Sequence, residues 1–284
     1  MTFLQILVLA VVQGAAELLP ISSSAHVIVA EKLMGLDPSS PEMTLLLVML
    51  HTGTMFAVIL FFWRSWKTAF FSSRKDAWVT VKLVIVSTLL TGIVGIVLKY
   101  IIEKFFLGNI PHAEIELIFG NMMLISAALA AVGILIIIAG WKSRHLGENA
   151  MLDVKASCWI GAVQGICLPF RGFSRSGATI STGLLLRIAK QRAEEFSFAL
   201  AVVLTPPVII REVLRLMNSH QSASIHGTTS LVGLLYPSLI GMVLSFASGL
   251  IALKWLSNWL ERGRWYVFGI YCLCASAAVF LLFV

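Results

Sequence analysis

The sequence predicts an all-α polytopic membrane protein in which six transmembrane helices and two re-entrant helical hairpins form an inverted-topology repeat. Hydrophobic residues make up 58% of the 284 residues and charged residues only 12%, whereas soluble domains carry about 25% charged residues. Six apolar segments have the length that a helix needs to cross a bilayer. Two further apolar segments are interrupted by polar residues. We therefore expect a single integral membrane domain over residues 1–284.

The six expected transmembrane helices are separated by short polar loops. Their ranges are 43–63, 78–102, 116–141, 196–217, 230–260 and 265–284. The fourth is expected to kink or break at Pro206 and Pro207, because proline lacks the N–H group that continues a helix.

One basic loop sets the predicted orientation. The residues from 64 to 82 contain several cations and one acid (Arg64, Lys67, Arg74, Lys75 and Lys82 against Asp76). Cytoplasmic loops carry such an excess of Lys and Arg, so we place this loop in the cytoplasm and the loop after residue 102 outside. The net charge of +7 is spread through short loops of this kind, and a nucleic-acid partner is not expected.

The first interrupted segment is QGAAELLPISSSAH at residues 13–26. It brings an amide, a carboxylate, a proline, three hydroxyls and an imidazole into an apolar stretch. Ionisable groups inside a membrane persist mainly where they face a cavity or a partner. Non-helical backbone at membrane depth must likewise be buried in protein or line water. The segment is therefore typical of a re-entrant hairpin that carries a site.

A second interrupted segment spans residues 156–187, with PFRGFSRSGATIST at its centre. The tetrapeptide VVQG at residues 11–14 recurs as AVQG at residues 162–165, an offset of 151 residues that also places Ser174 on Ser23. Each interrupted segment is followed by three spans, which inverts the second copy relative to the first. The predicted repeat halves are about 1–141 and 156–284, the first hairpin opening outward and the second inward.

The second hairpin is suited to bind phosphate. Helix N-termini bind anions, and the arginine guanidinium matches phosphate oxygens with two parallel hydrogen bonds. The predicted phosphate-binding groups are Arg175 with the hydroxyls of Ser174, Ser176 and Thr179, Arg171 as a second cation, and Ser22 from the first hairpin. A structural ion pair between Arg175 and Glu17 would be compatible with this function.

The first hairpin supplies groups for catalysis. Glu17 and His26 are candidate acid–base groups, and Ser23 is a candidate nucleophile three residues before the imidazole. Helical spacing would place Ser23 and His26 on one face. Gln13, one turn before Glu17, would share a metal ion with it or orient it. Attack by Ser23 is favoured, with attack by His26 or directly by water as alternatives. Together the hairpins predict phosphoryl transfer on a lipid substrate.

Three motifs closely resemble the signatures of the bacterial undecaprenyl-diphosphate phosphatases, the bacitracin-resistance family: Gln13-xxx-Glu17, Pro20-x-Ser22-Ser23-xx-His26 and Gly172-x-Ser174-Arg175-Ser176-xx-Thr179. The resemblance covers nearly the whole chain. It implies hydrolysis of a polyprenyl diphosphate to the monophosphate carrier lipid of cell-wall synthesis, with Arg175 holding the diphosphate. It also implies a divalent cation, Mg²⁺ or Ca²⁺, and a site in the bacterial inner membrane that opens toward the outside. This chain has Arg171 where the family usually has proline.

A polyprenyl-phosphate flippase, which binds the lipid phosphate without cleaving it, is the alternative function. The sequence leaves the oligomeric state open, a homodimer included. His51 lies within the first span, near Thr52 and Thr54, and is expected to be a hydrogen-bonded interior side chain rather than part of the site.

Overall fold

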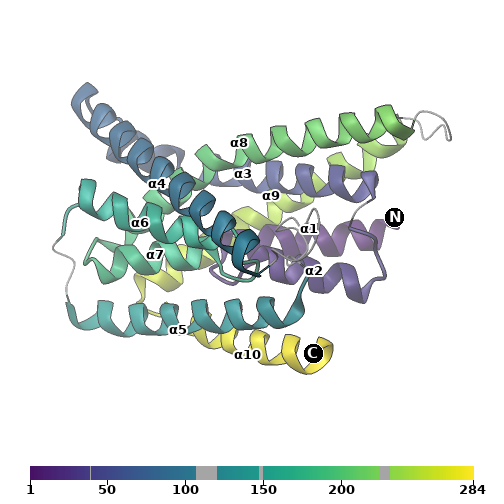
Figure 1. The fold of residues 1–284 in the computed structure, drawn as a ribbon. Helices are drawn as coiled ribbons and strands as arrows, with labels where there is room; N and C mark the ends of the chain where they lie inside the picture. The colour runs from purple at the N-terminus through teal and green to yellow at the C-terminus, as the bar shows by residue number, and fades with distance from the viewer. Residues whose placement is uncertain (39, 107–119, 147–149, 224–230) are drawn as a thin grey trace.

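The structure is a computed structural model that describes all residues except 39, 107–119, 147–149 and 224–230 (Figure 1). The described part contains ten α-helices, and its one β feature is an isolated bridge between Ala150 and Ile188. The helices are α1 (Phe3–Leu18), α2 (Ser23–Leu33), α3 (Pro41–Ala69), α4 (Arg74–Phe106), α5 (Met122–Leu146), α6 (Val154–Cys167), α7 (Arg175–Leu185), α8 (Lys190–Ala223), α9 (Leu231–Glu261) and α10 (Tyr266–Phe283). The all-helical prediction is confirmed.

Six of these helices, α3, α4, α5, α8, α9 and α10, are long and apolar enough to cross a membrane. This number agrees with the sequence prediction. Residues 116–119 and 230, which were predicted to begin two of the spans, lie outside the described residues, as does most of the loop expected to face outside. Helix α8 runs through Pro206 and Pro207 without breaking. Membrane helices tolerate proline where neighbouring groups or local adjustments satisfy the freed backbone.

The four remaining helices form two short pairs, α1 with α2 and α6 with α7. Helix α1 ends at Leu18 because Pro20 favours extended backbone at the preceding residue, and Leu19 has φ −71° and ψ 151°. Helix α7 begins at Arg175, where the Ser174 hydroxyl caps it by accepting a 3.2 Å hydrogen bond from the Gly177 N–H. A short non-helical segment joins the two helices of each pair, and these two segments lie next to each other.

Helices from the two halves of the chain pack against one another. Helix α1 packs on α9, and its counterpart α6 packs on α4; α5 packs on α10 and α3 on α8. In Figure 1, α5 and α10 lie side by side at the bottom and α3 and α8 at the top. At the α5–α10 contact, the Ser126 hydroxyl donates to the Ser276 carbonyl at 3.0 Å and the Ser276 hydroxyl donates to the Ser126 carbonyl at 2.7 Å.

The glycines of the two related tetrapeptides allow the short helices to approach the long ones. A Cβ atom on Gly14 would lie 2.6 Å from the Ser245 carbonyl oxygen of α9, and one on Gly165 would lie 2.8 Å from the Thr91 carbonyl oxygen of α4. Atoms this close overlap, so a side chain at either position would push the helices apart. The repeated glycine therefore has a packing function in each half.

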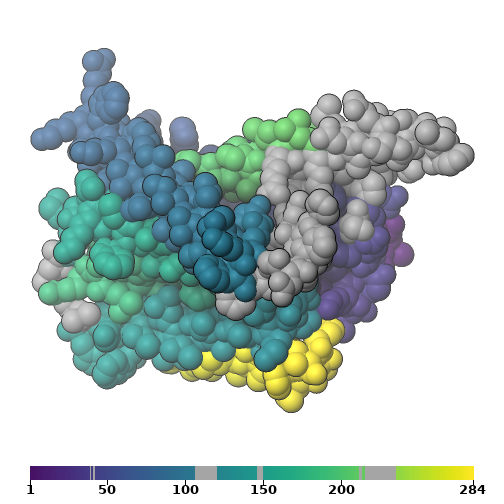
Figure 2. Space-filling view, viewed as in Figure 1, coloured from purple at the N-terminus to yellow at the C-terminus, as the bar shows by residue number. Residues whose placement is uncertain are grey.

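Helix α4 presents a strongly apolar outer face. Trp78, Ile96 and Phe105 are 75%, 71% and 73% exposed, and Figure 2 shows α4 in blue across the front of the molecule. Such a large exposed apolar surface marks contact with another apolar phase. For a helix of this length and hydropathy, that phase is the lipid bilayer.

Replacing Gly165 with alanine tests the close helix contact. We expect Gly165→Ala to lower the apparent Tm of the protein in detergent, because overpacking costs about 1–3 kcal/mol. Gly92→Ala is the control: Gly92 lies on α4, the helix that Gly165 of α6 contacts, but its added Cβ would have no atom within 4 Å. This variant should keep or raise the Tm, since alanine favours helices. Equal Tm values for the two variants would contradict the packing argument.

Candidate active site

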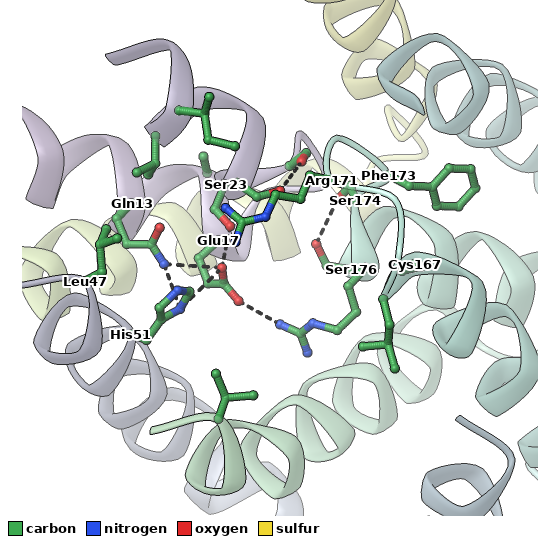
Figure 3. A pocket seen from close by; sticks show the side chains of 18 of the residues that line it. Gln13, Glu17, Ser23, Leu47, His51, Cys167, Arg171, Phe173, Ser174 and Ser176 are labelled. Carbon is green, nitrogen blue, oxygen red and sulfur yellow. Dashed lines mark hydrogen bonds and ion pairs between the residues drawn. The ribbon is translucent and has the colours of Figure 1, made fainter. Parts of the chain in front are cut away.

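A cavity of about 450 Å³ opens where the two short helix pairs meet (Figure 3). Its walls come from α1, α2, α3, the α6–α7 turn, the start of α7 and α8. Its polar lining residues are Gln13, Glu17, Ser22, Ser23, Ser24, Glu31, Thr44, His51, Arg171, Ser174, Arg175 and Ser176. All of the residues predicted for the site line this cavity except His26 and Thr179.

The carboxylate of Glu17 is the centre of the polar contacts. One oxygen, Oε2, accepts hydrogen bonds from the Ser23 hydroxyl at 2.5 Å and the Gln13 amide at 3.3 Å. The other, Oε1, accepts from the Arg175 guanidinium at 3.0 Å. The carboxylate is thus shared between a candidate nucleophile on one side and a cation on the other.

Arg175 reaches the cavity from the first position of α7. Its Nη2 binds Glu17, whereas its Nη1 is buried with no hydrogen-bond partner among the described residues. A buried donor without a partner is unfavourable, because it has given up its hydrogen bonds to water and gained none in return. Arg175 therefore holds the two hairpins together and also has one amine group available for an anion.

The hydroxyls around the cavity divide into two groups. Ser22 has φ +70°, a backbone conformation that is uncommon for residues other than glycine, and it presents the following Ser23 to Glu17. Ser24 accepts a 3.4 Å hydrogen bond from the Gly172 N–H of the opposite turn. Gly172 has φ +102°, which glycine adopts without strain. Ser22 and Ser23 are therefore held at the cavity by a turn that the second hairpin supports.

The second group of hydroxyls bonds mainly to protein. Ser176 donates to the Leu19 carbonyl at 3.3 Å and lies 3.4 Å from the Ser174 hydroxyl. The Thr179 hydroxyl donates to the Arg175 carbonyl at 2.8 Å and contacts the Ser197 hydroxyl of α8 at 2.6 Å. The structure places Thr179 behind Arg175, where it fixes α7 against α8 and does not line the cavity.

The expected pairing of His26 with Ser23 is not found. The His26 Nδ1 lies 2.7 Å from the Ser22 carbonyl oxygen, and its Nε2 lies 2.8 Å from the Tyr271 hydroxyl of α10. The imidazole also stacks on the Tyr271 ring. Both residues lie on α2, as expected, but their side chains point to different partners. Ser23 faces Glu17 of α1, and His26 faces Tyr271 of α10.

His51 has the hydrogen-bond contact that the sequence predicted for an interior side chain, but it also lines the cavity. Its Nδ1 lies 3.0 Å from the Gln13 amide nitrogen and 3.8 Å from Glu17 Oε2. Figure 3 shows the imidazole of α3 directed at the two α1 side chains. The sequence shows only that His51 is an imidazole within an apolar span. It does not indicate which other helix the side chain faces.

The donor atoms in the cavity bear on a divalent cation. Among the described residues, no three His, Cys, Asp or Glu side chains gather closely enough to hold a metal ion by themselves. Mg²⁺, however, is commonly held by one or two carboxylates together with substrate phosphates and water. Glu17 supplies such a carboxylate with the Gln13 amide beside it. The site therefore fits a cation that protein and phosphate hold jointly.

Comparison with known proteins agrees with this geometry. A protein of Acinetobacter baylyi named undecaprenyl-diphosphatase 2 is 56% identical over 99% of this chain and 98% of its own length. Undecaprenyl-diphosphatases of Parabacteroides distasonis and Bacteroides fragilis are 29% and 30% identical, over 97% and 96% of this chain and 96% and 95% of their own lengths. The family model for the bacitracin resistance protein BacA matches residues 6–278. The chain therefore belongs to the BacA family.

Proposed function

We propose that the protein is a membrane phosphatase that hydrolyses undecaprenyl diphosphate to undecaprenyl phosphate and inorganic phosphate, recycling the carrier lipid of cell-wall synthesis. One observation carries the mechanism: the Glu17 carboxylate accepts a hydrogen bond from the Ser23 hydroxyl at one oxygen and from the Arg175 guanidinium at the other. A base, a hydroxyl and a phosphate-binding cation are thus assembled in one cavity. Relatives named undecaprenyl-diphosphatase support hydrolysis rather than the flippase alternative.

In the first step, Ser23 Oγ attacks the terminal phosphorus while its proton passes to Glu17. The Oγ–P bond forms and the bond from phosphorus to the bridging oxygen breaks, so undecaprenyl phosphate leaves with the electron pair. In the second step, water attacks the phosphoserine, Glu17 returns the proton to Oγ, and the protons of the water leave with phosphate. The 2.5 Å contact between Ser23 and Glu17 favours Glu17 as the base.

Arg175 neutralises charge on the transferring phosphoryl group, which is where most catalysis of phosphoryl transfer arises. Its unpartnered Nη1 and its Nη2 together present the two donors that match phosphate oxygens. Ser22, Ser174 and Ser176 add hydroxyls at the same wall of the cavity. His51 and Gln13 keep the Glu17 carboxylate in place from α3 and α1.

A divalent cation, Mg²⁺ or Ca²⁺, would be held by Glu17, with Gln13 as a tentative further ligand, and would neutralise charge on the diphosphate. The residues that fit this function are the carboxylate and amide described above. Because phosphate oxygens would complete the coordination, affinity for the cation should rise when a diphosphate is present.

The two short helix pairs are proposed to be re-entrant hairpins within an inverted repeat. The packing of α1 on α9 and of α6 on α4 supports this arrangement, as do the close glycine contacts at both places. The basic residues between α3 and α4 would lie in the cytoplasm. The cavity would then open toward the outside of the bacterial inner membrane.

The charged pair should be indispensable for turnover. We expect Glu17→Gln and Arg175→Ala each to abolish phosphate release from a polyprenyl diphosphate by the purified protein, because one removes the base and the other the phosphoryl clamp. Glu103→Gln, which alters a carboxylate paired with Lys99 on α4, is the matched control and should keep wild-type turnover. Near-normal turnover in either site variant would refute the assignment.

The nucleophile is tested by comparing three neighbouring serines. Ser23→Ala should lose several orders of magnitude in kcat, whereas Ser22→Ala and Ser24→Ala should lose at most about 10²–10³, the cost of one stabilising hydrogen bond. Rapid acid quenching with a labelled terminal phosphate should trap label on wild-type protein and not on Ser23→Ala. Label retained in Ser23→Ala but lost in His26→Ala would transfer the role to His26.

Thiol labelling tests the orientation. In a background without the four native cysteines, Ser73→Cys between α3 and α4 should be protected from a membrane-impermeant reagent in intact cells. Gly120→Cys, before α5, should react because it lies on the other side of the membrane. The reverse pattern would place the cavity mouth on the cytoplasmic side.

A further inference from the structure

A second carboxylate and a second arginine lie at the same cavity. Glu31, on α2, and Arg171, in the turn between α6 and α7, both line it, and the positive charge of Arg171 attracts the Glu31 carboxylate. Figure 3 shows the Arg171 side chain extending from its turn into the cavity toward Ser23. As with Glu17 and Arg175, the acid comes from the first short helix pair and the cation from the second.

Glu31 is unusual for a charged residue. Its side chain is buried, with 3% of the residue exposed, and its Oε1 has no hydrogen-bond partner among the described residues. A buried carboxylate is costly unless it is paired and hydrogen-bonded. Glu31 thus brings a buried carboxylate with an unsatisfied oxygen to the same cavity as Arg171, whose positive charge attracts it.

The two arginines differ in depth. Arg171 is exposed to solvent, whereas the Arg175 side chain is 21% exposed and its Nη1 is buried. Arg175 is bound to the carboxylate that also binds Ser23, so it is placed at the phosphate that reacts. A lipid tail must leave the cavity through its mouth, which puts the lipid-linked phosphate nearer to the more exposed Arg171.

We propose that Arg171, positioned by Glu31, binds the lipid-linked phosphate of the substrate and makes the site selective for a diphosphate over a monophosphate. This inference rests on the proposed function and deepens it. The substrate would engage one arginine per phosphate, each with the bidentate geometry that suits the guanidinium. A monophosphate can engage only one of the two arginines, the deeper Arg175, so it binds more weakly than a diphosphate that engages both.

The test is a comparison of two ligands with the same prenyl chain. A non-hydrolysable farnesyl methylene diphosphonate and farnesyl monophosphate are titrated into purified protein in detergent, and Kd is measured calorimetrically. In Arg171→Ala, the affinity for the diphosphonate should fall by about 10- to 100-fold, the range for hydrogen bonds to charged groups, and the affinity for the monophosphate by much less. Arg175→Ala should weaken both ligands, and Lys99→Ala, a cation away from the cavity, neither.

The positioning role of Glu31 is tested with a double-mutant cycle. Glu31→Gln alone should weaken diphosphonate binding, because Arg171 loses the group that orients it. In the Arg171→Ala background the same change should instead restore part of the affinity, because it removes a buried negative charge that repels the ligand. A merely structural role would give the same loss in both backgrounds.

The outcomes separate this inference from the proposed function. Equal losses for the two ligands in Arg171→Ala, or a Glu31→Gln effect that is independent of Arg171, would overturn the inference even if the wild-type protein releases phosphate. Absence of phosphate release by the wild type would instead refute the proposed function. If Arg171→Ala does not fold, Arg171→Lys gives the same test, because it keeps the charge but loses the planar fork and should reduce the preference for the diphosphonate.

Discussion

The ion pair between Glu17 and Arg175 is the contact on which the site depends. Its 3.0 Å hydrogen bond joins residues 158 positions apart and so fixes the first short helix pair against the second. Removing one partner from a buried pair leaves the other charge uncompensated, which costs more than the pair itself contributes. The Ser176 hydroxyl on the Leu19 carbonyl and the Gly172 N–H on Ser24 reinforce the same junction. Gly14 of α1 packs closely on α9 and Gly165 of α6 packs closely on α4, and these contacts hold each short helix pair in position for the ion pair.

The sequence predicts the helical class, the six long helices and most of the cavity lining because these follow from local properties. Apolar length marks the spans, and Pro20 and Ser174 mark where α1 ends and α7 begins. A charge inside an apolar segment is itself a strong signal, which is why Glu17 and Arg175 were found. Each of these inferences needs only neighbouring residues.

Predictions that depended on the direction of a side chain were less successful. His26 has the spacing of a partner for Ser23, yet the positive φ of Ser22 sets the start of α2 so that the imidazole meets Tyr271. His51 reaches Gln13 from another helix, and no periodicity within α3 reveals that contact. Glu31 was not singled out because a Glu-Lys pair near the end of a helix is an ordinary surface pattern, and its burial depends on the distant turn that holds Arg171.

The separation of Glu17 from Arg175 along the chain has a consequence for biogenesis. Chains are made and inserted from the N-terminus, so α1 enters the membrane long before the arginine 158 residues later has been synthesised. During that interval Glu17 lacks its cation, and an ionised carboxylate among lipid tails is expensive. The first short helix pair can therefore reach its final packing only when the second half arrives. Nascent chains that stop before α7 should remain shallow at the membrane surface and be exposed to quality-control proteases.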